Sequence, residues 1–136
     1  MSRVICAFVV FLFTPIVSAW ASDGTTEIDI PAAKSLYDKG VVFIDARSER
    51  SFKNKGHIAG AFNLTEGSKD FTEANLLKLA AKDQPVVFYC NCVYGGCSIS
   101  PDAAKDAVDM GYQEVYYFKE GTYGWSKAGY AVEKSE

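Results

Sequence analysis

The chain has 136 residues, of which 49% are hydrophobic and 14% aromatic, so it is long enough for one packed domain and too apolar for a disordered tail. The formal net charge is −3, from 14 basic and 17 acidic residues, and no run of lysine or arginine stands out. A nucleic-acid-binding protein would need a basic stripe, so we expect no nucleic-acid partner.

Residues 1–21 are typical of a secretory signal peptide. Arg3 gives a positive start, a largely apolar run extends over 4–17, and Ala19-Trp20-Ala21 places small residues where a signal peptidase cleaves. The apolar run is shorter than the roughly 20 residues that span a bilayer, which favours cleavage over a retained membrane anchor. We therefore expect an exported protein of a bacterial periplasm, with no stable membrane insertion after cleavage and one mature domain over 22–136.

Cleavage would remove Arg3 and Cys6, leaving 13 basic against 17 acidic residues, or a charge of −4, and three cysteines. These three, Cys90, Cys92 and Cys97, fall within eight residues, too close together to staple distant parts of the chain. An odd number of cysteines in an oxidising compartment leaves at least one thiol unpaired or joined to another molecule. The cluster therefore marks a site rather than a structural framework.

In chain order, the hydrophobic pattern alternates between strand and helix. The expected elements of the first half are an edge strand over 27–30, a helix from Pro31 that ends at Gly40, a buried strand over 41–44, a surface helix over 48–55 and an amphipathic helix over 71–82 that Thr72 caps.

The second half continues this alternation. Its expected elements are a buried strand over 85–89, a helix that Ser100 caps and Pro101 opens and that ends at Gly111, a central strand over 115–118, and a short helix around Trp125 between Gly121 and Gly129. Strands that alternate with helices predict one α/β domain with a mostly parallel sheet.

Cys90 follows directly after a buried strand, where open α/β sheets bind their ligands. The next residues, Asn91-Cys92-Val93-Tyr94-Gly95-Gly96-Cys97-Ser98, form a loop whose paired glycines allow the backbone to curl before a helix begins. Inward N–H groups and a helix N-terminus would stabilise a thiolate and lower the pKa of Cys90. The alternative is an inert buried cysteine. The loop favours the reactive interpretation.

Three segments resemble the signatures of the rhodanese family, in order and over residues 26–133. They are Asp45-Ala46-Arg47-Ser48-Glu49 with Gly56-His57-Ile58-Ala59-Gly60-Ala61-Phe62-Asn63-Leu64, then Phe88-Tyr89-Cys90, then Gly121-Thr122-Tyr123-Gly124-Trp125 with Gly129-Tyr130-Ala131-Val132. The resemblance implies a rhodanese-like α/β fold, with a central parallel five-stranded sheet flanked by helices. It also implies a sulfurtransferase in which Cys90 accepts a sulfane sulfur as a persulfide and passes it on.

The implied partners are a small sulfur donor and a thiol or cyanide-like acceptor, which includes protein thiols. The covalent persulfide takes the place of a cofactor, and no metal is expected. Four residues outside the loop are expected to support the site: Asp45 through hydrogen bonds to backbone groups, Arg47 through a pair with Asp45 or Glu49, His57 in a structural turn rather than as a base, and Trp125 in the core near the site.

The cysteine loop departs from the pattern of the family. Most active members have a six-residue loop with a cation for the anionic donor, whereas this loop is longer and places Ile99 where an arginine is expected. Cys90, Asn91 and Cys97 resemble a longer form of the C-N-G-x-x-C loop of an exported subgroup. No cation of the loop is therefore available for thiosulfate. A cysteine phosphatase would need the same cation, which disfavours that chemistry.

The two additional cysteines leave three interpretations open. Cys92 or Cys97 resolves an oxidised or persulfidated Cys90 by forming a disulfide, or the three thiolates bind zinc or Cu(I), or Cys92 and Cys97 form a disulfide that only closes the loop. The alternative function is accordingly a thiol–disulfide redox or binding module on a rhodanese scaffold.

Overall fold

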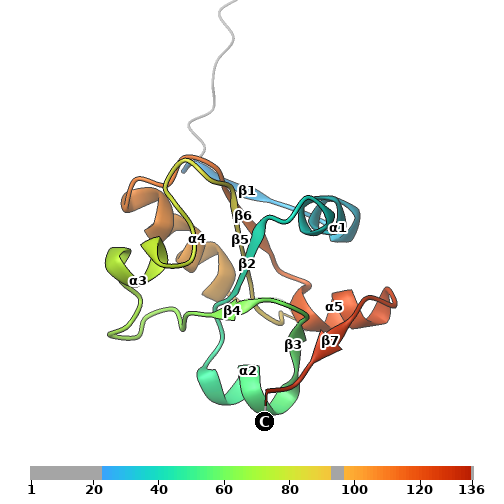
Figure 1. The fold of residues 1–136 in the computed structure, drawn as a ribbon. Helices are drawn as coiled ribbons and strands as arrows, with labels where there is room; N and C mark the ends of the chain where they lie inside the picture. The colour runs from blue at the N-terminus through green and yellow to red at the C-terminus, as the bar shows by residue number, and fades with distance from the viewer. Residues whose placement is uncertain (1–22, 93–96, 136) are drawn as a thin grey trace, which may run out of the picture.

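Strands and helices alternate along residues 23–92 and 97–135, which are the parts of the chain that the computed structural model describes (Figure 1). The strands are β1 (Thr25–Glu27), β2 (Val42–Asp45), β3 (His57–Ile58), β4 (Phe62–Asn63), β5 (Val86–Tyr89), β6 (Val115–Phe118) and β7 (Val132–Glu133). The helices are α1 (Ile30–Asp38), α2 (Glu49–Lys55), α3 (Glu73–Leu77), α4 (Ile99–Asp109) and α5 (Gly121–Lys127). Within these ranges, no helix is long and apolar enough to cross a membrane.

The main sheet of the described residues has five strands in the order β1-β6-β5-β2-β4, and each pairs in parallel with its neighbour. β5 lies at its centre and is fully buried from Val86 to Tyr89, as its unbroken apolar sequence predicted. The parallel α/β sheet flanked by helices is thus confirmed. Because all five strands run the same way, their carboxyl ends meet at one edge.

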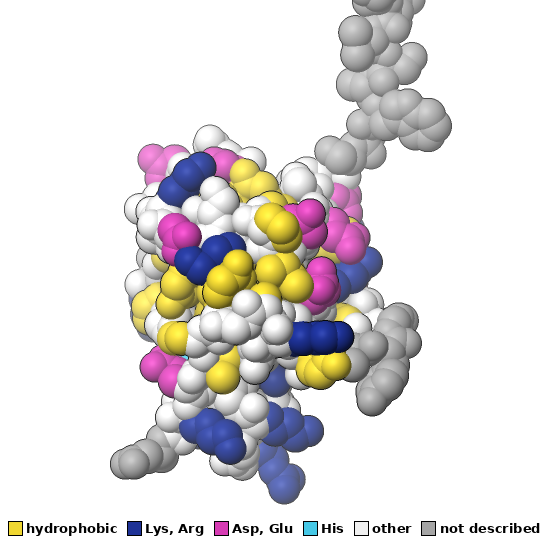
Figure 2. All heavy atoms as spheres, turned by 90° about the vertical axis from the view of Figure 1, so that its right-hand side faces the viewer, with side chains coloured by type: hydrophobic (Ala, Val, Ile, Leu, Met, Phe, Trp, Pro, Cys, Tyr) yellow, Lys and Arg dark blue, Asp and Glu magenta, His cyan; other side chains and the backbone are white. Residues whose placement is uncertain are grey.

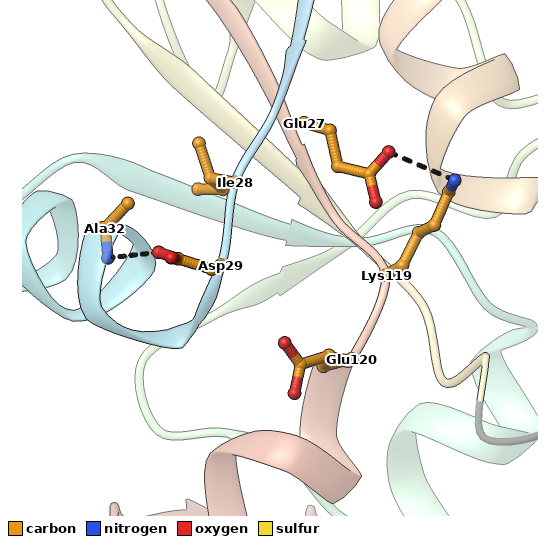
Figure 3. Close-up of a pocket in the computed structure, with 6 residues that line it drawn as sticks. All are labelled: Glu27, Ile28, Asp29, Ala32, Lys119 and Glu120. Carbon is orange, nitrogen blue, oxygen red and sulfur yellow. Dashed lines mark hydrogen bonds and ion pairs between the residues drawn. The ribbon is translucent and has the colours of Figure 1, made fainter.

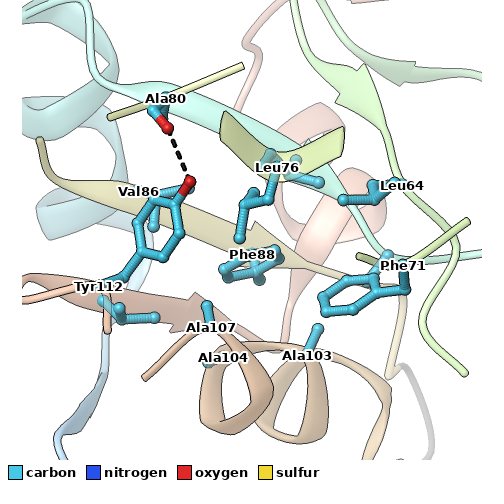
Figure 4. Packing of buried hydrophobic residues seen from close by; sticks show 13 residues of the cluster. Leu64, Phe71, Leu76, Ala80, Val86, Phe88, Ala103, Ala104, Ala107 and Tyr112 are labelled. Carbon is cyan, nitrogen blue, oxygen red and sulfur yellow. Dashed lines mark hydrogen bonds between the residues drawn. The ribbon is translucent and has the colours of Figure 1, made fainter. Parts of the chain in front are cut away.

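Two apolar layers hold helices on opposite faces of the sheet. On one face, Leu76 of α3 and the alanines of α4 pack against Phe88 and its neighbours (Figure 4). On the other face, Ala33 of α1 and Trp125 of α5 pack against alternate residues of the same strands. The alternation of side chains along β5 therefore serves both layers.

Two helix starts differ from the sequence prediction. The edge strand ends at Glu27, because Asp29 is the N-cap of α1 and its Oδ1 accepts a hydrogen bond from the Ala32 N–H at 3.0 Å. Ser100 does not cap α4, which begins at Ile99 after Ser98. Ser100 instead lies in the first turn and is fully buried.

The helix expected over 71–82 is also shorter. Thr72 caps it as predicted, with the Asn75 N–H at 3.3 Å, but α3 ends at Leu77. The chain then turns so that Ala80 enters the core, where the Tyr112 hydroxyl donates to its carbonyl at 2.7 Å. The Ala80 carbonyl is thus bonded to a residue 32 positions further along the chain.

Candidate active site

Cys90 lies at the carboxyl end of the central strand β5, as predicted, and its side chain is fully buried. Its Sγ lies 3.2 Å from the Ser100 Oγ in the first turn of α4. Burial raises the pKa of this thiol, whereas hydrogen bonds from the hydroxyl and backbone of Ser100 and from the backbone of Asn91 lower it. The net shift is upward. The expectation of a lowered pKa is therefore wrong for this state, because loss of water outweighs the donors.

Cys92 and Cys97 form a disulfide, so the loop-closing pairing is the one that the structure contains. Cys90 keeps a free thiol. The Cys90 Sγ lies 2.7 Å from the Cys92 Sγ and 3.2 Å from the Cys97 Sγ. The disulfide is thus in direct contact with the thiol expected to react.

Among the described residues, these three cysteines form a cluster of side chains that could ligate a metal ion. Their Sγ atoms lie within 4.8 Å of one another. After reduction they would offer three soft ligands, a set that suits Cu(I) better than structural zinc, which takes four.

The beginning of the loop is held by the segment that follows β6. The Cys92 N–H donates to the Lys119 carbonyl at 3.0 Å, and the Asn91 Oδ1 accepts from the Tyr123 N–H at 3.0 Å. Ser98 makes no side-chain cap bond to α4. The expected curl at Val93-Tyr94-Gly95-Gly96 lies outside the described residues.

Asp45 and Arg47 form a buried ion pair at the carboxyl end of β2, the strand that pairs with β5. Asp45 accepts hydrogen bonds from the Arg47 backbone N–H at 3.0 Å, from Nε at 2.9 and 3.1 Å, and from Nη2 at 2.6 Å. The Arg47 Nη2 also donates to the Gly56 carbonyl at 2.7 Å and to the Thr122 Oγ1 at 3.2 Å. Glu49 pairs with Lys53 instead. The guanidinium thereby connects β2, the end of α2 and α5.

His57 and Trp125 both make contacts that stabilise the fold. His57 stacks on Phe52, its Nδ1 lies 3.0 Å from the Phe52 carbonyl, and its Nε2 lies 3.2 Å from the Glu133 Oε1. Trp125 is buried in the core, and its Nε1 donates to the Ala131 carbonyl at 3.1 Å. Both ring nitrogens of the histidine are occupied by partners other than Cys90.

A cavity of about 390 Å³ opens beside the cysteine loop, and one of its lining residues is a lysine, Lys55, that the sequence did not single out. Lys55 and Ser51 of α2 line it opposite Asn91, Cys97 and Ile99. Arg47 also lines this cavity, but it is buried and paired with Asp45, so Lys55 is the exposed cation among the lining residues. The basic end of α2 was visible in the sequence, but its packing against the loop was not.

The charge around the carboxyl edge of the sheet is uneven. Figure 2 shows lysine and arginine side chains gathered at the end of the molecule where α2 lies in Figure 1, and α2 carries the exposed Arg50, Lys53 and Lys55.

A second cavity, of about 450 Å³, lies where β1 and β6 end (Figure 3). Glu27, Asp29 and Glu120 line it, and its Lys119 is paired with Glu27 at 3.1 Å. An anion would be attracted to the cavity of Lys55 and repelled from this one.

Comparison with known proteins agrees with the resemblance. The profile of the rhodanese-like domain family matches residues 30–128. The thiosulfate sulfurtransferase GlpE of Vibrio cholerae is 32% identical over 83% of this chain and 99% of its own length, and that of Shewanella oneidensis is 37% identical over 66% and 80%.

Among solved structures, a Bacillus halodurans protein superimposes with a TM-score of 0.67 over 80% of this chain and 77% of its own, at 22% identity. This likeness supports the fold. The two GlpE relatives are thiosulfate sulfurtransferases. The family profile and the length and identity of these sequence matches show that the chain belongs to the rhodanese-like domain family.

Proposed function

We propose that this protein is a sulfurtransferase that carries sulfane sulfur as a persulfide on Cys90. The observation that carries the proposal is the position of Cys90 at the end of β5, with Ser100 Oγ at 3.2 Å and backbone donors of Asn91 and Ser100 around its sulfur. The thiosulfate sulfurtransferase relatives support the same reaction type.

The reaction would proceed in two half-reactions. With thiosulfate as donor, the Cys90 thiolate attacks the outer sulfur, the S–S bond of thiosulfate breaks, and sulfite leaves with the bonding electron pair. A cyanide or thiol acceptor then attacks the outer sulfur of the persulfide, and Cys90 leaves as thiolate. Donors from Ser100 and Asn91 would stabilise the negative charge on sulfur in both steps.

We place the donor in the cavity between α2 and the cysteine loop. The sulfur donors of this chemistry are anions, and Lys55 is the exposed cation of that cavity. The cavity also borders Asn91 and Cys97, which adjoin the reactive thiol.

The first test uses a variant with Cys92→Ser and Cys97→Ser, so that Cys90 is the only loop thiol. After reduction and removal of the reductant, this variant is mixed anaerobically with thiosulfate or with inorganic polysulfide and studied by intact-protein and peptide mass spectrometry. We expect a gain of about 32 Da on the peptide that contains Cys90, with one sulfite released for each sulfur taken from thiosulfate. The matched control adds Cys90→Ser and should gain nothing. A double variant that stays unmodified with both donors would overturn the proposal.

A thiol–disulfide module is the second candidate, because the structure contains a disulfide in contact with a free thiol. Such a module would cycle between thiol and disulfide without releasing sulfite from thiosulfate, and the double variant would remain at its starting mass.

We also propose that residues 1–21 direct export and are then removed. Expression of the full chain in a bacterium should give a periplasmic protein whose intact mass corresponds to a start at Ser22. Substitution of Ala19 and Ala21 by bulky residues should leave the precursor uncleaved. A cytoplasmic protein that keeps Met1 would contradict this assignment.

A further inference from the structure

The arrangement of the three sulfurs suggests a fate for the persulfide other than transfer. The free thiol of Cys90 is in contact with both cysteines of the disulfide, with the Cys92 Sγ nearer, at 2.7 Å, than the Cys97 Sγ, at 3.2 Å. When Cys92 and Cys97 are reduced, two further thiols therefore lie within reach of the sulfur that carries the persulfide. A thiolate in such contact with a disulfide-like bond is positioned for exchange.

We propose that the reduced protein discharges its own persulfide as sulfide, with Cys92 and Cys97 acting as an internal dithiol reductant. This inference depends on the persulfide of the proposed function and adds a second activity, persulfide reduction, at the same site. The two electrons come from the two thiols, and the product is the Cys92–Cys97 disulfide that the structure contains.

The first step is an attack of the Cys92 thiolate on the Cys90 Sγ. The bond between the Cys90 Sγ and the outer sulfur breaks, and the outer sulfur leaves with the electron pair and takes up the proton that the Cys92 thiol lost, which gives hydrosulfide. A Cys90–Cys92 disulfide forms, so the sulfane sulfur is reduced while the two cysteine sulfurs are oxidised. Cys92 is the attacking residue because its sulfur is the nearer one.

In the second step, the Cys97 thiolate attacks the Cys92 Sγ. The Cys90–Cys92 bond breaks, Cys90 leaves as a thiolate and takes up a proton, and the Cys92–Cys97 disulfide forms. Burial raises the pKa of Cys90 in this product, which favours the protonated, inactive thiol. Cys90 is also fully buried there. The site then stays closed until an external thiol reductant opens the disulfide.

The experiment is a single turnover without external reductant. Fully reduced wild-type protein, freed of reductant, is mixed anaerobically with thiosulfate, and sulfite, sulfide and intact mass are followed together. We expect one sulfite and one sulfide for each chain, a loss of two hydrogens from the protein, and peptides joined through Cys92 and Cys97.

Single variants separate the two steps. Cys92→Ser should release sulfide more slowly than wild-type protein, because only the more distant Cys97 Sγ, at 3.2 Å, remains as a nucleophile. The Cys92→Ser/Cys97→Ser variant should keep the added sulfur on Cys90 and release sulfide at least about 100-fold more slowly. Cys97→Ser should release one sulfide and stop as a Cys90–Cys92 disulfide.

The outcomes are distinguishable from those of the proposed function. If the Cys92→Ser/Cys97→Ser variant loads Cys90 but reduced wild-type protein keeps its persulfide and releases no sulfide, internal reduction is wrong and sulfur transfer stands. Equal sulfide release by wild-type protein and Cys92→Ser would likewise overturn the role of Cys92. If the double variant accepts no sulfur from thiosulfate or polysulfide, both proposals fail.

Discussion

Asp45 and Arg47 form a buried ion pair close to Cys90. Asp45 is the register partner of Tyr89, the last residue of β5 and the one before Cys90. The two side chains are nearly inaccessible to water, with 0% and 8% of their surface exposed. Each is satisfied by the other and by fixed groups, and the guanidinium also reaches Gly56 and Thr122. A charge left unpaired at such a place is costly.

We therefore expect Asp45→Asn to lower the free energy of unfolding by about 3 kcal/mol, as measured by urea denaturation. The double variant with Arg47→Gln should lose less than the sum of the single variants, because neither partner then leaves an unpaired charge. Lys105→Ala is a matched control, since it breaks an exposed pair with Asp109 and should change stability far less. If the losses of unfolding free energy of the two single variants simply add in the double variant, Asp45 and Arg47 are not energetically coupled.

The raised pKa of Cys90 leads to a second prediction about a single residue. It applies to the protein in which the Cys92–Cys97 disulfide is formed. Below the pKa of an unfolded thiol, about 8.5, both the folded and the unfolded state hold the proton. Above it the unfolded state loses the proton first, so the free energy of unfolding decreases as the pH rises.

Urea denaturation between about pH 8 and about pH 10 should therefore show a steeper loss of stability in the wild-type protein than in Cys90→Ser, which shares every tyrosine. Alkylation of Cys90 by iodoacetamide should be slow at neutral pH for the same reason. Equal pH slopes of the two proteins would show that the folded protein does not disfavour the thiolate.

At the scale of elements, α5 reaches the site through its first residue. Gly121 has φ +54°, and a Cβ built on it would lie 1.3 Å from the Cys90 carbonyl oxygen. The start of α5 can approach the end of β5 this closely only because the residue has no side chain.

Gly121→Ala should consequently cost at least about 3 kcal/mol of stability or prevent folding, because two backbone segments must separate. Gly129→Ala is the control: Gly129 also has a positive φ, +87°, but a Cβ there would meet nothing within 4 Å, so a loss of about 1 kcal/mol is expected. Thermal unfolding of both variants would test the difference. Similar losses would mean that φ alone, and not the contact with Cys90, requires glycine at position 121.

The elements that could be predicted from the sequence are those whose burial leaves a local pattern. β2, β5 and β6 coincide within one residue with the strands expected over 41–44, 85–89 and 115–118, and α1 and α4 end two residues before the expected glycines, Gly40 and Gly111. The two-residue strands β3 and β7 could not be found in this way, because they are too short to show a period. They exist through pairing of His57 and Ile58 with Val132 and Glu133, about 75 positions away in the chain.

The site was predictable to a similar extent. The strand end identified Cys90, and the family signatures identified Asp45 and Arg47. Ser100 was misread as a cap, because its contact with the Cys90 Sγ depends on how α4 docks on β5. Lys55 was missed because its place opposite the loop depends on the packing of α2, which no local pattern encodes.

At the scale of the whole molecule, the carboxyl edge of the sheet has a basic side and an acidic side. Lys55 lines the cavity beside the cysteine loop, whereas Glu27, Asp29 and Glu120 line the cavity at the ends of β1 and β6. The proposed anionic donor would therefore be attracted to the α2 side of this edge and repelled from the acidic side. Because Lys55 is exposed, its attraction is screened by water, and a factor of about 3 to 5 in donor affinity is the size to expect.

Lys55→Gln should raise the KM for thiosulfate by about this factor at low ionic strength and leave kcat nearly unchanged, because the charge acts on the bound donor and its transition state alike. The difference should shrink as salt is added, since the screening length falls to about 10 Å at 0.1 M. The matched control is Lys39→Gln, an exposed lysine just before β2 at the opposite edge of the sheet, which should leave KM unchanged. If both variants behave alike, net charge rather than the cavity of Lys55 attracts the donor. A salt-independent loss in Lys55→Gln that lowers kcat would instead indicate that α2 positions the cysteine loop.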